Sequence, residues 1–103
     1  MNYSELIALI EKEWDLDSGF LGMIREGRFD REAHNRCKQA LERIRLESKS
    51  EEYIPRRLVS LVWYIPLFMS WQTERVKSSI DIAEYHRAAN EFQTKVQEIL
   101  GVP

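Results

Sequence analysis

Residues 81–101 read DIAEYHRAANEFQTKVQEILG, and this segment decides the fold class. Its apolar residues recur at alternating spacings of three and four, which is the period of an amphipathic α-helix. They are Ile82, Tyr85, Ala89, Phe92, Val96 and Ile99. Asp81 followed three residues later by Glu84 resembles a capping box, and Gly101 is a typical helix stop. The segment therefore predicts a long helix with one buried face, and hence an all-α protein.

Two other segments carry the same helical period. Asn2 precedes an apolar pattern over residues 3–14, and Asp30 precedes one over residues 31–47. Asn and Asp are preferred N-cap residues, so both patterns predict helices with defined starts. Residues 20–26 are short and apolar on one side, which predicts a helical turn between them.

Residues 58–65 read LVSLVWYI and contain a single polar residue, Ser60. A helix that is apolar on all sides normally lies at the centre of its domain. Pro66 follows, and its ring removes a donor and clashes with the carbonyl of Val62, so the helix should be kinked or broken there. A strand is the alternative, although no partner strand is visible. We expect one compact domain, residues 1–103, built as a bundle of four or five helices around this central apolar helix.

The composition excludes several classes of protein. Hydrophobic residues make up 44% and charged residues 31% of the chain, which is typical of a globular domain. Cys37 is the one cysteine, so no intramolecular disulfide can form. The longest apolar stretch, residues 58–71, is shorter than the about 20 residues of a membrane span, and residues 1–10 lack the basic flank of a signal peptide. We therefore expect a cytoplasmic protein with no membrane contact.

Basic residues form two rows on the helix predicted over residues 31–47. Arg31, Lys38 and Arg45 are seven residues apart, and so are Arg36 and Arg43. Such rows can bind phosphates, which makes a nucleic-acid-binding module the first alternative function. However, the two rows fall on opposite flanks of the apolar stripe, where long basic side chains commonly cover the core margin. The sequence pI of 5.7 is also far below the value above about 9 expected for nucleic-acid-binding domains.

His34, Cys37 and His86 are the candidate ligands for a metal ion. His34 and Cys37 are three residues apart, so both could contact one ion from one helical turn. A small metal-dependent enzyme is therefore the second alternative function. Zinc sites need three or four ligands in a tight arrangement, however, and Cys37 lies on the apolar stripe, where it would pack as a small core residue. Because no phosphate-binding loop or nucleophile elbow is present either, we expect no cofactor, no metal and no enzymatic activity.

Four acidic residues, Glu11, Glu13, Asp15 and Asp17, follow one another at the end of the first predicted helix. Such a group is usually solvated. It could also meet a basic protein surface, where complementary charge speeds association and sets specificity.

Aromatic residues are numerous for a small helical core. Trp14, Trp63, Tyr64 and Trp71 are the candidates for a binding surface, because Trp, Tyr and Arg are enriched at interface hot spots. Trp63, Tyr64 and Trp71 point in different directions on one helix, so at least one should reach the surface. The alternative is that all of them pack inside the bundle with their polar atoms hydrogen-bonded.

These patterns together favour a non-enzymatic protein that acts by binding a protein partner. In size and charge the chain resembles immunity and antitoxin proteins, which are small acidic proteins that block a toxin partner. That resemblance implies an inhibitor that works by steric occlusion, with the acidic group facing a basic site. An adaptor is the other form that a protein-binding function could take. A homodimer is a further option, because the apolar spacing over residues 82–99 also suits a coiled-coil seam.

Overall fold

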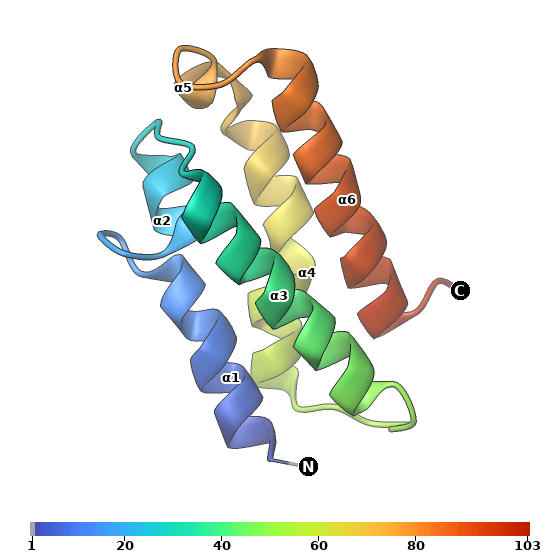
Figure 1. The fold of residues 1–103 in the computed structure, drawn as a ribbon. Helices are drawn as coiled ribbons and strands as arrows, with labels where there is room; N and C mark the ends of the chain where they lie inside the picture. Colours follow the sequence, from blue (N-terminus) through green and yellow to red (C-terminus); the bar gives the residue numbers. More distant parts are fainter. Residues whose placement is uncertain (1) are drawn as a thin grey trace.

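The computed structural model describes residues 2–103 and confirms the all-α prediction, because these residues form helices and turns without a strand (Figure 1). The elements are α1 (Tyr3–Glu11), the 3₁₀ turn η1 (Lys12–Trp14), α2 (Phe20–Arg25), α3 (Arg31–Ser48), α4 (Arg56–Trp71), α5 (Thr73–Val76) and α6 (Ile82–Leu100). Residues 58–65 lie within α4, so the strand alternative for this segment is wrong.

Four helices, α1, α3, α4 and α6, form a bundle. α1 packs against α3 and α4, and α6 also packs against α3 and α4, so α1 and α6 stand at opposite corners of a square. α3 and α6 run in the same direction, and α1 and α4 run the opposite way (Figure 1). Four ion pairs between α3 and α6 join residues 53 positions apart and fix the register of the two helices. They are Arg31–Glu84, Lys38–Glu91, Glu42–Lys95 and Arg45–Glu98.

The three predicted N-caps are confirmed. The side chains of Asn2, Asp30 and Asp81 each accept a hydrogen bond from the backbone N–H three residues further on. Gly101 ends α6 with a φ of 88°, in the left-handed region that favours glycine. These helix ends could be predicted because each cap forms within a few residues of sequence.

α4 differs from the expectation in two ways. It runs from Arg56 to Trp71 without interruption, so the predicted break at Pro66 is wrong; a kink there stays a prediction. Proline removes its own N–H donor, while the hydrogen bonds of the turns before and after it can still form. α4 packs against α1, α2, α5 and α6, as expected of a central helix, but the bundle does not enclose it. One side of α4 is exposed, because the helix occupies a corner of the square.

The core lies between the four helices of the bundle. Its largest fully buried side chains include Phe20, Tyr85 and Phe92. The Tyr85 hydroxyl donates a hydrogen bond of 2.6 Å to the carbonyl oxygen of Met69, so its polar atom is satisfied inside the core. The apolar stripe of α6 thus packs toward the core, with Tyr85, Phe92 and Val96 buried and Ile82, Ala89 and Ile99 half-buried. A homodimer through this stripe stays a prediction.

The sequence did not predict α5, which adds a sixth α-helix to the four or five expected in the part of the chain that is described. Its buried residue, Val76, follows a turn at Gln72. A membrane-spanning helix is not found among residues 2–103, since none of their helices combines the necessary length with sufficient hydropathy.

The turn between η1 and α2 packs backbone against backbone. A Cβ atom added at Gly22 would lie 1.8 Å from the carbonyl oxygen of Asp15, and one added at Gly19 would lie 2.4 Å from that of Glu13. Only glycine leaves room for this approach. The contact fixes η1 against α2 and so positions the side chains that η1 carries.

Candidate protein-binding surface

The exposed side of α4 carries large apolar residues at regular spacing. Trp63, Leu67 and Trp71 follow one another at intervals of four residues, so they lie on one face of the helix. The expectation that Trp63 and Trp71 point in different directions is therefore wrong. Their exposed fractions are 48%, 37% and 63%. We call these three residues the α4 face. Monomeric proteins rarely expose large apolar side chains in a contiguous group unless the group binds something.

Half-buried aromatic rings support the α4 face from one side. The Tyr64 ring lies 5.5 Å from Trp63, 5.9 Å from Trp71 and 6.0 Å from Trp14, measured between ring centroids. Trp14 in turn donates its indole N–H to the carbonyl oxygen of Leu61 at 3.0 Å. Because this cluster joins η1 to α4, the two exposed tryptophans rest on a packed aromatic base.

The four aromatic residues predicted as candidates therefore have two different roles. Trp63 and Trp71 are exposed, whereas Trp14 and Tyr64 are partly buried and hold them in place. Leu67 was missed by sequence reasoning, which considered aromatic residues alone. Its position midway between Trp63 and Trp71 at helical spacing was the available signal.

Grooves lie on both sides of α4, and the one on the α6 side includes residues of the α4 face. On the α1 side, a cavity of about 530 Å³ lies between α1, η1 and α4. On the α6 side, two adjoining cavities of about 320 and 310 Å³ share Pro66, Ser70 and Gln93. The complete lining of the α6-side groove is Trp63, Pro66, Leu67, Ser70, His86, Ala89, Asn90 and Gln93. It contains no Asp, Glu, Lys or Arg, although 31% of the chain is charged.

Ion pairs connect the helices in three of the four pairs of neighbouring helices in the bundle. α3 pairs with α6 on one side, as described above, and with the α1–η1 segment on the other through Arg43–Glu5 and Arg36–Glu13. α1 pairs with α4 through Glu11–Arg57 at 2.6 Å. Within residues 2–103 no ion pair joins α4 to α6. The side of the bundle that carries the α4 face is thus also its least charged side.

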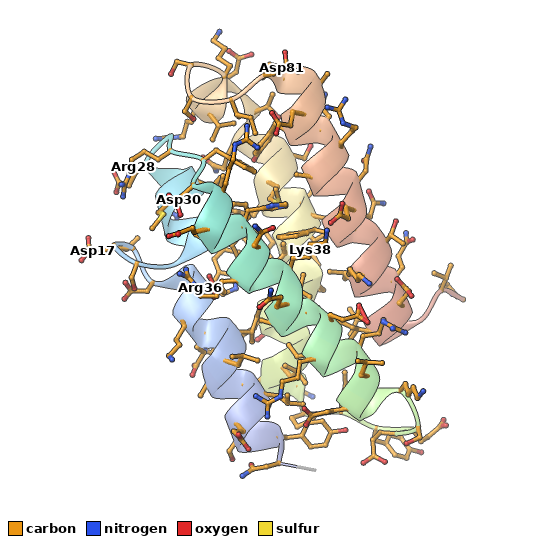
Figure 2. The ribbon with its side chains drawn as sticks, viewed as in Figure 1. Asp17, Arg28, Asp30, Arg36, Lys38 and Asp81 are labelled. Carbon is orange, nitrogen blue, oxygen red and sulfur yellow. The ribbon has the colours of Figure 1, made fainter. Side chains whose placement is uncertain are left out.

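Glu13 does not lie on the surface, which corrects its assignment to an acidic binding group. Its exposed fraction is 1%, and its carboxylate accepts hydrogen bonds from the backbone N–H of Phe20 at 3.1 Å and from the Arg36 guanidinium at 2.9 and 3.0 Å. Figure 2 shows Arg36 on α3 and Asp17 at the outer edge of the turn, pointing away from the bundle. The burial of this carboxylate could not be predicted, because its partner Arg36 is 23 residues away in the sequence.

The other three acidic candidates are exposed, with different contacts. Glu11 pairs with Arg57, and Asp15 accepts hydrogen bonds from the backbone of Asp17 and Ser18. These hydrogen bonds, the one from the Ser18 backbone first, lower the pKa of Asp15. The structure therefore does not bring the four acids together as one free acidic surface.

The basic rows of α3 lie on the flanks of its apolar stripe, as predicted. Arg31, Lys38 and Arg45 face carboxylates of α6, whereas Arg36 and Arg43 face carboxylates of the α1–η1 segment. Hydrogen bonds to Glu13 and to Glu47, respectively, raise the pKa values of Arg36 and Arg43. Because each of these five basic residues already has an acidic partner, the rows offer little free charge for phosphates.

His34, Cys37 and His86 do not form a ligand set. Among residues 2–103, no three His, Cys, Asp or Glu side chains lie close enough to hold a metal ion. Cys37 is fully buried in the core, which raises the pKa of its thiol. His34 packs among aromatic rings, while His86 is exposed and lines the α6-side groove.

Comparison with known proteins gives no match, whether to a family model, to a curated protein or to a solved structure. The candidate surface is therefore argued from the residues and geometry of this chain.

Proposed function

We propose that this protein acts without catalysis, by binding a protein partner through the α4 face. The observation that carries the proposal is the exposure of Trp63, Leu67 and Trp71 beside a groove that is lined without charged residues. The cores of protein interfaces are depleted in charged residues and enriched in aromatic ones. Tryptophan in particular dominates the small set of residues that carry most binding energy.

The aromatic base beneath the α4 face supports this proposal. Side chains that are already held in place lose less conformational freedom on binding, and this raises affinity. Tyr64 lies within 6.0 Å of the rings of Trp14, Trp63 and Trp71, so it restricts the exposed indoles before any partner arrives. The Trp14 hydrogen bond to Leu61 restrains this base from the side of η1.

An inhibitor of the immunity or antitoxin kind is the form of this function that we propose, with an adaptor as its variant. A rigid bundle that presents an exposed apolar side can block a partner's site by occlusion. The exposed acids Glu11 and Asp15 line the α1-side groove, and Asp17 is exposed on the turn that follows η1; all three would steer a basic partner toward this part of the molecule. Glu13 has no part in this steering.

The proposal can be tested by affinity capture with a matched control variant. The tagged chain, the Trp63→Ala/Trp71→Ala variant and the Leu46→Ala/Tyr53→Ala variant are each incubated with extract of the native host. Leu46 and Tyr53 are also exposed large apolar residues, but they lie outside the α4 face. Bound proteins are then quantified by mass spectrometry.

We expect at least one protein to be captured by the wild type and the control and reduced at least about tenfold with the double Trp variant, as expected for loss of hot-spot residues. If each captured protein binds all three chains equally, the α4 face is not the binding surface and the proposal fails.

A further inference from the structure

The α4 face has an internal symmetry. Trp63 and Trp71 each lie four residues from Leu67, which is about 6 Å along the helix axis on either side. If two copies of α4 packed antiparallel about a two-fold axis through Leu67, each Trp63 would meet the other copy's Trp71. Interfaces with two-fold symmetry need such self-complementary patches, because the same surface is used on both subunits.

The charges around the α4 face suit the same arrangement. A residue near a two-fold axis meets its own copy, so a charged residue there would repel itself. The exposed residues of α4 between Leu58 and Trp71 are uncharged, including Ser60 and Ser70. The charged residues of α4 stand at its start, Arg56 and Arg57.

The area available is small but sufficient for a weak dimer. α4 has 16 residues and is thus about 24 Å long, and together with the adjoining α6 surface it is about 20 Å wide. Each copy would contribute about 500 Å², so about 1,000 Å² would be buried in total, at the lower end of specific interfaces.

We propose that a second copy of this chain covers the α4 face and forms a two-fold symmetric dimer with antiparallel α4 helices. The dimer uses the surface of the proposed function but does not depend on it, because self-association needs no other protein. A partner that binds the α4 face would compete with the second copy.

Sedimentation equilibrium of the untagged chain over a wide concentration range tests this proposal. We expect the mass to rise from 12.3 kDa toward twice that value, with a dissociation constant on the order of 10–100 µM, as befits an interface of this size. Leu67→Glu should raise that constant by at least about tenfold, because two like charges would meet at the axis. The control, Leu46→Glu, places the same charge at an exposed leucine of α3 and should leave the constant unchanged.

Circular dichroism confirms that each variant is folded, and Trp71→Glu replaces Leu67→Glu if that variant is not.

Two outcomes would overturn the dimer. They are a monomer at every concentration, and association that Leu67→Glu and Leu46→Glu change to the same extent. The two proposals also fail separately. A monomeric chain that still loses a captured protein when Trp63 and Trp71 are replaced would retain the proposed function without the dimer.

Discussion

Glu13 is a carboxylate buried at the junction of three elements. It belongs to η1, accepts the backbone N–H of Phe20 at the start of α2, and pairs with Arg36 of α3. A buried polar group without partners is costly, so these hydrogen bonds are what make its burial tolerable. One side chain thereby ties three separate segments together.

We expect Glu13→Ala to lower the free energy of unfolding by about 1–3 kcal/mol, because the N–H of Phe20 and the Arg36 guanidinium lose their acceptor. The Arg36 side chain is half exposed, so water can still solvate its charge and limits the loss. Urea denaturation provides the measurement. Asp17→Ala serves as the exposed acidic control and should change stability by no more than about 0.5 kcal/mol; equal losses would contradict the structural role of Glu13.

His34 occupies an aromatic cluster. Its ring lies 5.3 Å from the ring of Phe92 in a stacked arrangement and 5.5 Å from that of Phe20, and its Nε2 atom is buried without a hydrogen-bond partner. Burial lowers the pKa of His34, and the neighbouring charges of Lys38 and Arg31 act in the same direction. The carboxylates of Glu91 and Glu84 act in the opposite direction but do not reverse the shift.

This lowered pKa makes stability depend on pH. Below about pH 6.5 the unfolded chain binds a proton at His34 that the folded chain takes up only at lower pH, so folding stability should fall as the pH drops through this range. Thermal unfolding between pH 7.5 and 5.5 measures the slope. His34→Gln should flatten it, whereas His86→Gln, which changes an exposed histidine outside the cluster, should not. An unchanged slope in His34→Gln would assign the proton to another group.

Helix α4 is continuous although it contains a proline, which usually breaks or kinks a helix. Pro66 lies in its interior, so the carbonyl of Val62 lacks its usual donor. Pro66 is half-buried and lines the α6-side groove. The helix persists because packing against its neighbours outweighs the local preference.

Pro66→Ala should raise the free energy of unfolding by about 1–3 kcal/mol, because alanine restores the donor and is a far better helix former. Chemical denaturation measures the change. Ser70→Ala, at an exposed position on the same helix, should stay within about 0.5 kcal/mol of the wild type. A loss of stability in Pro66→Ala would mean that the packing of the proline ring matters more than the missing hydrogen bond.

Elements whose cause is local could be predicted from the sequence. The starts at Asn2, Asp30 and Asp81 follow from hydrogen bonds across three residues, and the stripe of α6 follows from its periodicity. The exposed side of α4 could not be predicted in this way. All sides of its apolar segment look alike in sequence, so the positions of α1 and α6 decide that Trp63 and Trp71 remain uncovered.

The whole molecule divides its charges unevenly. Ion pairs connect α3 to α6 and to the α1–η1 segment, and they connect α1 to α4. Among the described residues, no ion pair connects α4 to α6. Glu42 is a central member of this network, because it accepts hydrogen bonds from Arg45 and from Lys95 of α6. These contacts, with Arg45 first, lower the pKa of Glu42 to about 2.

The network should therefore contribute stability above pH 4.5 and lose it as the pH falls toward about 2, since the unfolded chain protonates Glu42 before the folded chain does. Glu42→Gln removes this contribution. We expect the stability difference between wild type and Glu42→Gln to shrink as urea denaturation is moved from pH 6 to lower pH values in this range. Glu32→Gln, at an acid that makes no ion pair within residues 2–103, should show no such convergence; a difference that is constant with pH would contradict the role of Glu42.

The unequal placement of the three tryptophans also gives the molecule a built-in optical reporter. Trp63 and Trp71 are in contact with water, so they should dominate the red side of the intrinsic fluorescence emission, while Trp14 is shielded and hydrogen-bonded. Whatever covers the α4 face should shift that emission to the blue and protect it from a soluble quencher. Occupancy of this surface can thus be followed by light, without attaching a dye to the chain.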